Sequence, residues 1–239
     1  MVNETFFLDE CRRGSGLFPK DQKPAVRGKI LEGGFETVHY DVTHVKKAIH
    51  LIRNPFHNIV SRFHLERKHW VEGEKKHEVD RYTNDAKGFH FWCKDLNEQF
   101  GPTFLSSPAA ASNKEAQVSI PRDVVELMQD VPCHGEMYKY VQWHNHANTV
   151  MTNHLKKPTM IVHYENYEHA WNKTVGNILN FLHLEKKGEP SKFSARHDYD
   201  PYFSPEQRLA AQKLIVRLAR PAIYNQLERY FPKKQKYLR

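Results

Sequence analysis

The chain has 239 residues, of which 39% are hydrophobic and 27% charged, and this composition is typical of globular proteins and excludes disordered or fibrous ones. Lysine and arginine number 36 against 28 aspartate and glutamate residues, and the net charge of +8 at pH 7 favours anionic partners such as nucleotides, phosphates, sulfated sugars or nucleic acid. No apolar run approaches the ~20 residues that span a bilayer, and the N-terminus has no apolar signal-peptide core, so we expect the printed chain to be soluble.

The first strong element is Ala48-Ile-His-Leu-Ile, a mostly apolar run that ends at Arg53-Asn-Pro and predicts a buried strand running into a turn. A helix is expected next, because Asn54 is a good N-cap and Pro55 suits the first helical position. Apolar residues then recur at helical spacing, at Phe56, Ile59, Val60 and Phe63. The segment therefore predicts a strand, a tight turn and a helix.

Beyond this helix, apolar patterns of helical and of strand type alternate along the chain. After the charged stretch from Glu66 to Arg81 we expect a helix that carries Phe89, Trp92, Leu96 and Phe100 and ends at Gly101-Pro102, followed by a loop over 102–120. A helix from His134 to about His154 and a strand at Thr159-Met-Ile-Val-His are expected next. The last expected elements are a helix with Trp171, Val175, Ile178, Leu179 and Leu182 on its apolar side and a C-terminal helix after the capping box of Ser204-Pro-Glu-Gln. This order favours an α/β layered domain with a largely parallel sheet.

No internal repeat or linker divides the sequence, so we expect a single domain over 1–239, with an irregular, turn-rich start over 1–30. In a parallel α/β domain, ligands bind at the carboxyl ends of strands, where a helix N-terminus presents unpaired N–H groups. Arg53 stands at such a junction, and Ser61 lies two turns into the helix. A guanidinium and a hydroxyl can grip one phosphate, but Arg53 paired with a nearby carboxylate and Ser61 exposed on the helix is an equally open interpretation.

The segment from Ala48 to Phe63 resembles the second nucleotide-binding motif of sulfotransferases, in which a hydrophobic strand leads to Arg-x-Pro and then to a helical serine. In that family the arginine and serine bind the 3′-phosphate of 3′-phosphoadenosine 5′-phosphosulfate (PAPS), which implies this role for Arg53 and Ser61. Tyr164-Glu-Asn-Tyr is similar to the family's Tyr-Glu-Asp/Asn element, and Asp198-Tyr-Asp-Pro-Tyr-Phe-Ser-Pro-Glu-Gln resembles the acceptor-side tail of carbohydrate-type members.

The resemblance implies a three-layer, P-loop NTPase-like sulfotransferase fold with a mostly parallel sheet. It also implies transfer of a sulfuryl group from PAPS to a hydroxyl or amine on a carbohydrate, with no metal and no nucleic acid involved. Family members carry an earlier loop of the Gly-Ser-Gly-Asn-Thr-Trp kind that cradles the 5′-phosphosulfate. Arg13-Gly-Ser-Gly16 is not followed by Thr-Trp, so we expect an N-terminally truncated domain, and a catalytically inactive nucleotide- or polyanion-binding module is the alternative function.

Relatives often use the histidine of a Lys-Thr-His segment as the base on the acceptor hydroxyl. Glu36-Thr-Val-His39 lies in the corresponding region, so the resemblance makes His39 the candidate base and His44 the reserve, with a structural or surface role for His39 as the alternative. Arg196 is a candidate second basic contact to the nucleotide or to an anionic acceptor, with an ordinary surface arginine as the alternative.

Two other basic or histidine-rich segments invite a different interpretation. His144 and His146 point apart at a spacing of two on a helix, so we expect no shared metal, and Trp143-His-Asn is expected to pack this helix onto the sheet or to line the acceptor cleft. The basic tail over 232–239 is expected to be a solvated chain end, and we find no basic face with interleaved aromatics of the kind that binds nucleic acid.

Cys11, Cys93 and Cys133 are too few for a disulfide scaffold and too far apart for a zinc knuckle, so they are expected to be buried thiols, two of which pair if the protein is secretory. Asn3-Glu-Thr and Asn172-Lys-Thr are glycosylation sequons that are used only in a secretory lumen. Because carbohydrate-type relatives are Golgi-lumenal with an N-terminal membrane anchor, the resemblance implies that location, with any anchor upstream of the printed sequence and the cytoplasm as the alternative.

Overall fold

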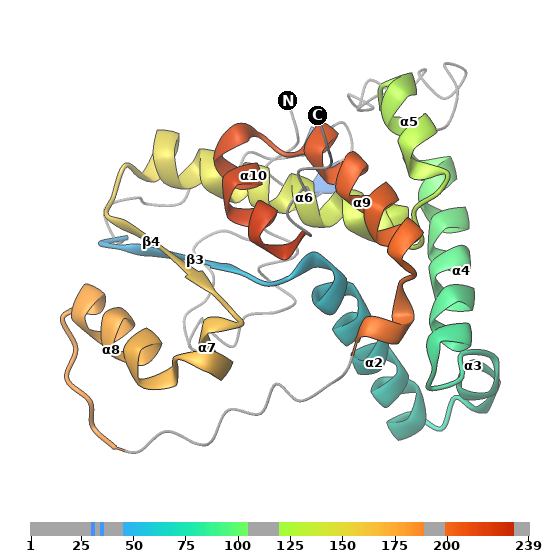
Figure 1. Ribbon diagram of the computed structural model, residues 1–239, viewed down its shortest axis with the longest axis horizontal. Coiled ribbons are helices and arrows are strands. Elements are labelled where there is room, and N and C mark those ends of the chain that lie inside the picture. Colours follow the sequence, from blue (N-terminus) through green and yellow to red (C-terminus); the bar gives the residue numbers. More distant parts are fainter. Residues whose placement is uncertain (1–29, 32–33, 36–44, 105–119, 189–198, 232–239) are drawn as a thin grey trace, which may run out of the picture.

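The computed structural model describes residues 30–31, 34–35, 45–104, 120–188 and 199–231 (Figure 1). In chain order its elements are β1 (Ile30–Leu31), β2 (Gly34–Phe35), β3 (Ala48–Ile52), α2 (Pro55–Glu72), α3 (Lys76–Arg81), α4 (Ala86–Phe104), α5 (Arg122–Met128), α6 (His134–Thr149) continued by a π-helix (Val150–Leu155), β4 (Thr159–His163), α7 (Asn166–His169), α8 (Trp171–Leu182), a 3₁₀ turn (Asp200–Tyr202), α9 (Pro205–Leu218), α10 (Pro221–Leu227) and a 3₁₀ turn (Glu228–Tyr230). Both predicted strands are confirmed with their bounds.

Strands β3 and β4 pair in parallel, with Ala48 opposite Thr159 and Ile52 opposite His163. The short strands β1 and β2 form a separate antiparallel pair. Helices α6 and α10 lie on one side of the β3–β4 pair, and α7 and α8 lie on the other (Figure 1). The expected mixed architecture with helices around a small parallel sheet is therefore confirmed for the part of the chain that is described.

The turn from β3 into α2 forms as the sequence predicts. The side-chain oxygen of Asn54 accepts the backbone N–H groups of Phe56 (3.0 Å) and His57 (3.4 Å), and Pro55 occupies the first helical turn. The predicted apolar side of the helix is buried, at Phe56, Ile59, Val60 and Phe63. These contacts fix where the strand ends and the direction in which the helix leaves it.

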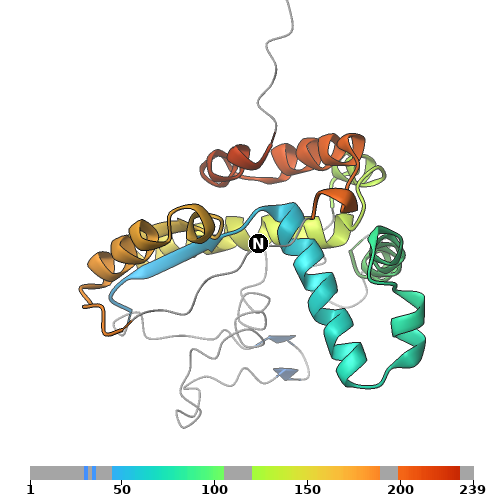
Figure 2. The same cartoon turned by 60° about the horizontal axis from the view of Figure 1, so that its bottom comes forward.

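No element was predicted within the charged stretch from Glu66 to Arg81, yet α2 continues to Glu72 and α3 follows within it. Figure 2 shows the cause, because α2 projects away from the sheet and carries α3 at its far end. A helix that leaves the core has little apolar surface to bury, so apolar residues no longer recur at helical spacing although the backbone stays helical. Pairs such as Lys68 with Glu72, one turn apart, add modest support.

Helix α4 shows a second departure from the sequence prediction. The expected stop at Gly101-Pro102 is wrong, since the helix continues to Phe104. Proline fixes φ near the helical value, so near the end of a helix it removes one hydrogen bond without breaking the turn. The expected loop over 102–120 falls mostly outside the described residues, and α5, which the sequence prediction missed, follows it.

A disulfide joins Cys93 of α4 to Cys133, the residue that precedes α6. Both cysteines are buried, as expected, and their pairing is the alternative that the sequence analysis left open, while Cys11 lies outside the described residues. The helices approach closely at this point: a side chain on Gly135 would meet Phe100 at 2.8 Å. The disulfide therefore links α4, and with it α2 and α3, to α6, the helix that covers the sheet.

Helix α6 matches the predicted span from His134 to about His154, because the π-helix carries it to Leu155. The expected apolar face is buried, at Met137, Tyr140, Val141, His144 and Met151. Packing of the Trp143-His-Asn segment onto the sheet is confirmed by the contact of His144 with His50 of β3.

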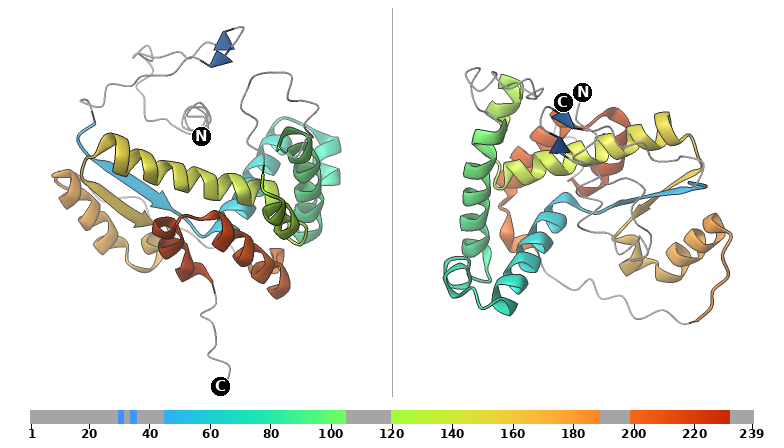
Figure 3. Two further views of the ribbon diagram at one scale, coloured as in Figure 1. Left: turned by 90° about the horizontal axis from the view of Figure 1, so that it is seen from above. Right: turned by 180° about the vertical axis from the view of Figure 1, so that it is seen from behind.

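The C-terminal helices lie beside α6 (Figure 3). The capping box predicted at the start of α9 is present, with Ser204 and Gln207 bonding to each other's backbone N–H groups. The side chain of Asn145 on α6 donates to the carbonyl of Leu218 (2.9 Å) and accepts the N–H of Arg220 (2.9 Å), which fixes the corner between α9 and α10. This corner positions α10 beside the sheet.

Candidate functional site

Arg53 follows the last residue of β3, at the carboxyl end of the strand. Its guanidinium carbon lies 4.5 Å from the ring centre of Tyr164 and 6.0 Å from that of Tyr199. The Nε atom is buried and has no hydrogen-bond partner, and Arg53 forms no ion pair with any described residue. No carboxylate of the described residues therefore pairs with Arg53, although the sequence left that alternative open. Tyrosine rings favour a cation but accept none of its N–H groups in the plane of the guanidinium, so these donors stay available to an anion.

The turn that carries Arg53 is held by residues that follow the neighbouring strand. The N–H of Asn54 donates to Glu165 Oε1 (2.8 Å), and the hydroxyl of Tyr140 donates to the carbonyl of Arg53 (2.5 Å). The second oxygen of Glu165 accepts the hydroxyl of Tyr230 (2.7 Å). The backbone on both sides of the Arg53 peptide is thereby fixed from β4, α6 and the C-terminal turn.

The hydroxyl of Tyr230 also lies 2.7 Å from Nδ1 of His163. Burial and the hydrogen bond to Glu165 raise the pKa of Tyr230, so this hydroxyl keeps its proton and donates to the carboxylate. Burial and the charge of Arg229 lower the pKa of His163, and its other ring nitrogen, Nε2, lies 3.3 Å from Oε1 of Gln226. A chain of hydrogen bonds therefore joins His163, Tyr230, Glu165 and the backbone of Asn54.

Sequence reasoning missed Glu165 and Tyr230 as parts of this site. A signal for Glu165 was present, because Tyr164-Glu-Asn follows β4, and residues that follow adjacent parallel strands meet at one edge of a sheet. No comparable signal existed for Tyr230, whose approach depends on the corner between α9 and α10. Only the tertiary structure brings it to the strand ends.

Ser61 lies on α2, two turns after the Asn54 cap, and is half-buried. Its hydroxyl has no hydrogen-bond partner among the described residues. His57, four residues earlier and so on the same side of the helix, packs on the ring of Tyr199 at 5.3 Å between ring centres. Arg53 faces this same ring, so the structure brings Arg53 and His57 to one tyrosine, and Ser61 follows one turn after His57 on α2.

Beneath this junction, β3 and α6 are joined by two buried histidines. Nε2 of His50 and Nδ1 of His144 lie 2.7 Å apart, and their rings are stacked. Burial lowers the pKa of His50 to about 4, and burial together with the His50 charge lowers the pKa of His144. Both rings are therefore neutral near pH 7, where one nitrogen donates to the other. Nδ1 of His50 has no partner, which fits an unprotonated nitrogen there.

Several predicted site residues cannot be located. His39, His44 and Arg196 lie outside the described residues, and so does the segment Arg13-Gly-Ser-Gly16. The structure consequently gives positions for Arg53, just before α2, and for Ser61, on α2, but none for the expected base or second basic contact.

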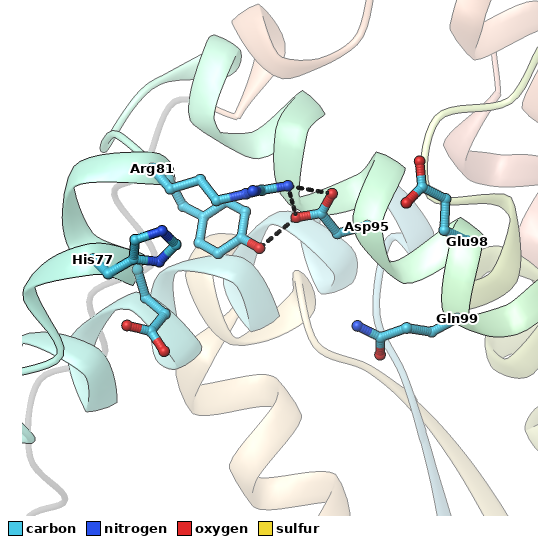
Figure 4. Close-up of a pocket in the computed structure, with 7 residues that line it drawn as sticks. His77, Arg81, Asp95, Glu98 and Gln99 are labelled. Atoms are coloured by element: carbon cyan, nitrogen blue, oxygen red, sulfur yellow. Dashed lines mark hydrogen bonds and ion pairs between the residues drawn. The ribbon is translucent and has the colours of Figure 1, made fainter.

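A surface hollow of about 510 Å³ lies between α3 and α4 (Figure 4). Its lining residues are His77, Glu78, Arg81, Tyr82, Asp95, Glu98 and Gln99. Arg81 pairs with Asp95 at 2.6 Å, and the hydroxyl of Tyr82 donates to the same carboxylate. None of the residues that surround Arg53 lines this hollow, so the two places are separate.

The described ranges contain neither a metal-binding cluster nor a membrane-spanning helix. No group of three histidine, cysteine, aspartate or glutamate side chains in these ranges is arranged to hold a metal ion. None of the described helices combines the length and the apolar character that crossing a membrane requires.

Comparison with known proteins bears on this arrangement. The family model of the sulfotransferase domain matches residues 42–200, which is more than half of the chain. No curated protein and no solved structure gives a significant match. The matched span contains β3, α2 and β4, and with them Arg53, Ser61 and Glu165. The chain belongs to the sulfotransferase domain family.

Proposed function

We propose that this protein binds PAPS and transfers its sulfuryl group to a hydroxyl or amine of a carbohydrate acceptor. Sulfotransferase domains generally use PAPS, which carries a phosphate on the ribose 3′ position. Binding of PAPS is supported here by Arg53 at the end of β3. Its buried Nε has no hydrogen-bond partner among the described residues, and no described carboxylate pairs with its charge. A buried donor of this kind costs stability unless a ligand uses it.

In this proposal Arg53 and Ser61 hold the 3′-phosphate. The guanidinium offers two parallel N–H donors that match two phosphate oxygens, and the Ser61 hydroxyl offers one more. The bonds from Glu165 and Tyr140 to the turn keep the guanidinium in place before the ligand arrives, so little ordering is needed on binding. The role of these residues is to fix the position of the donor relative to the acceptor.

The transfer step is a displacement at sulfur. The acceptor oxygen or nitrogen forms a bond to sulfur while the bond from sulfur to the phosphate oxygen of PAPS breaks, leaving adenosine 3′,5′-bisphosphate. The acceptor proton passes to a base, for which we propose His39, with His44 in reserve. Arg196 is proposed as a second basic contact to the nucleotide or to an anionic acceptor.

The test uses the full chain. Calorimetric titration with adenosine 3′,5′-bisphosphate is expected to show binding, and incubation with radiolabelled PAPS and a panel of glycans is expected to label one of them. Binding without labelling of any glycan would favour the alternative, a module that binds nucleotide or polyanion and does not catalyse transfer. Absence of nucleotide binding by folded protein would overturn the proposal.

Arg53 and Ser61 are expected to contribute unequally to the affinity for the nucleotide. Ser61→Ala removes one neutral hydrogen bond and is expected to weaken nucleotide binding about fivefold, since such a bond contributes about 1 kcal/mol. Thr152, an exposed hydroxyl residue of the π-helix that continues α6, provides a control substitution to alanine that is expected to leave nucleotide binding unchanged. A loss in Ser61→Ala no larger than in that control would remove Ser61 from the site.

We also propose that the sheet extends into the three-layer, P-loop NTPase-like arrangement of the family. Helices on both sides of the parallel β3–β4 pair support this, because parallel strands are normally covered on both faces. The remaining strands would have to come from residues outside the described ranges. An experimental structure with β3 and β4 alone in the sheet would contradict this extension.

For location, we propose an oxidising secretory compartment such as the Golgi lumen. The disulfide between Cys93 and Cys133 supports this, because disulfides persist there and are rare in the cytosol. Asn172 of the sequon at the start of α8 is exposed and accessible to a glycan. Thiol counting on protein purified from its native source is expected to find Cys93 and Cys133 oxidised; finding both reduced would favour the cytoplasm instead.

A further inference from the structure

His57 lies between the two proposed phosphate ligands along α2. His57 and Ser61 are four residues apart on α2, so their side chains lie on one side of this helix, and Arg53 directly precedes its N-cap. The ring of Tyr199 links Arg53 to His57, because it contacts the Arg53 guanidinium at 6.0 Å and the His57 ring at 5.3 Å. An anion held by Arg53 and Ser61 therefore lies within reach of the imidazole.

The imidazole of His57 has hydrogen-bonding capacity that the described protein does not use. Its ring is half-buried and packs on Tyr199, but neither ring nitrogen has a hydrogen-bond partner among the described residues. By comparison, His64, two turns further along α2, lies 3.1 Å from Oδ1 of Asn84 through its Nδ1. An edge-to-face ring contact uses no N–H group, so a ring N–H of His57 remains available to a ligand.

Four charged groups from four segments surround His57, and they act in opposite directions. They are Arg53 after β3, Glu165 after β4, Asp200 in the 3₁₀ turn and Arg208 on α9. Asp200 pairs with Arg208 at 2.9 Å, and Glu165 accepts the bonds from Asn54 and Tyr230. Burial is the largest influence, and together with the arginines it holds the pKa of His57 below its ordinary value of 6.5.

We propose that His57 is a third ligand of the nucleotide's 3′-phosphate and that its ring takes up a proton when the nucleotide binds at mildly acidic pH. The inference rests on the proposed function, since it requires a phosphate between Arg53 and Ser61. A phosphate dianion beside the ring opposes the effect of the arginines and of burial, and so favours the charged imidazolium. Binding then strengthens as the pH falls, relative to a protein that lacks the imidazole.

The test compares three full-length proteins by titration with adenosine 3′,5′-bisphosphate at pH 5.5, 6.5 and 7.5. They are the wild type, His57→Gln, and His69→Gln as a control, because His69 is an exposed histidine of the same helix. The ratio of the His57→Gln Kd to the wild-type Kd is expected to rise from about twofold at pH 7.5 to about tenfold at pH 5.5, the change that one pKa unit gives. Titration of the ligand's own phosphate cancels in this ratio, and the ratio for His69→Gln is expected to stay near one.

The outcomes separate this inference from the proposed function. If wild type fails to bind at every pH, the proposed function fails and the inference with it. If wild type binds and Arg53→Ala abolishes binding, but the His57→Gln ratio does not change with pH, the proposed function stands and the role of His57 is overturned.

A second measurement covers the case in which His57→Gln does not fold. The His57 Cε1–H resonance of wild type is followed by NMR from pH 4.5 to 8, with and without saturating nucleotide. Its pKa is expected to rise by about one unit with nucleotide, since an adjacent opposite charge favours the protonated ring. A pKa that does not change on binding would overturn the inference without any substitution.

Discussion

Arg81 and Arg53 both lie against tyrosine rings, and they differ in what else surrounds them. Arg81, between α3 and α4, lies 5.6 Å from the ring centre of Tyr82 and pairs with Asp95 at 2.6 Å. Arg53, at the end of β3, lies 4.5 Å from the ring centre of Tyr164, and its buried Nε has no partner. Asp95 neutralises the guanidinium of Arg81, whereas no carboxylate of the described ranges pairs with that of Arg53.

The difference separates a structural arginine from a candidate ligand-binding one. The acidic partner and the exposed position of Arg81 make the hollow beside it an ordinary surface ion-pair cluster. At Arg53 the nearby carboxylate of Glu165 instead accepts a backbone N–H and the Tyr230 hydroxyl, so among the described residues it leaves the charge of the arginine unpaired. The partners of the two guanidinium groups are therefore what distinguish the candidate site from the surface cluster.

The largest expected effect is on nucleotide affinity. Arg53→Ala removes two charge-assisted hydrogen bonds and is expected to weaken binding of adenosine 3′,5′-bisphosphate about 100-fold, or about 3 kcal/mol. Arg81→Ala is the matched control and is expected to change the affinity less than twofold. Calorimetry on both variants measures the difference, and equal losses would erase the distinction between the two arginines.

Glu165→Ala tests whether the turn around Arg53 is prearranged. Loss of this carboxylate leaves the N–H of Asn54 and the hydroxyl of Tyr230 without their acceptor, and we expect a loss of about 2 kcal/mol in unfolding free energy. Because Arg53 is then less firmly held, nucleotide affinity is expected to fall about tenfold. Urea unfolding and calorimetry measure the two quantities.

The control for this variant is Glu168→Ala, in which the side chain lost has only a 3.9 Å contact with His169. It is expected to leave both quantities unchanged. A Glu165→Ala protein with unaltered affinity would show that the bonds to the turn do not position the arginine.

The histidine pair below Arg53 predicts a pH dependence that the Arg81 region lacks. Because the folded-state pKa of His50 is lowered from 6.5 to about 4, the unfolded chain binds the proton more readily. The unfolding free energy is therefore expected to be unaffected by this group above pH 6.5 and to fall as the pH drops toward 4, by about 2 kcal/mol at pH 5. Urea unfolding at pH 7.5 and pH 5 measures this change.

Replacement of both buried histidines by leucine is expected to reduce that acid loss, since neither ring is then available to be protonated. His69→Gln, which changes an exposed histidine, is expected to keep the wild-type pH dependence. An acid loss of the same size in the leucine double variant would mean that other groups cause it.

The smallest expected effect concerns the neutralised arginine. Arg81→Ala removes an ion pair whose arginine is 48% exposed, and such pairs contribute at most about 1 kcal/mol. We expect a decrease in unfolding free energy within that limit, measured by urea unfolding. A decrease of several kcal/mol would mean that the α3–α4 cluster is a structural centre and that the comparison understates it.

Local signals in the sequence predicted the parts of the fold that depend on neighbouring residues. The bounds of β3, the Asn54 cap and the Ser204 capping box each follow from residue types within a few positions. The continuation of α4 to Phe104 and the length of α2 did not, because at those places the hydrophobic period fades while the backbone remains helical.

The candidate site divides in the same way. Arg53 and Ser61 were recognisable from the strand, turn and helix that carry them. Tyr230 and Tyr199 are brought there from more than 130 residues away along the chain, so no local pattern indicated them. The pairing of Cys93 with Cys133 likewise depends on how α4 meets α6. The sequence thus indicated the candidate ligand-binding residues better than the residues that surround them.

The most direct measurement is a crystal structure of the full chain with adenosine 3′,5′-bisphosphate. The 3′-phosphate is expected to lie against Arg53, with one oxygen accepting from Nε and another within hydrogen-bonding distance of the Ser61 hydroxyl. A nucleotide bound elsewhere, with Nε of Arg53 still unpartnered, would contradict the account.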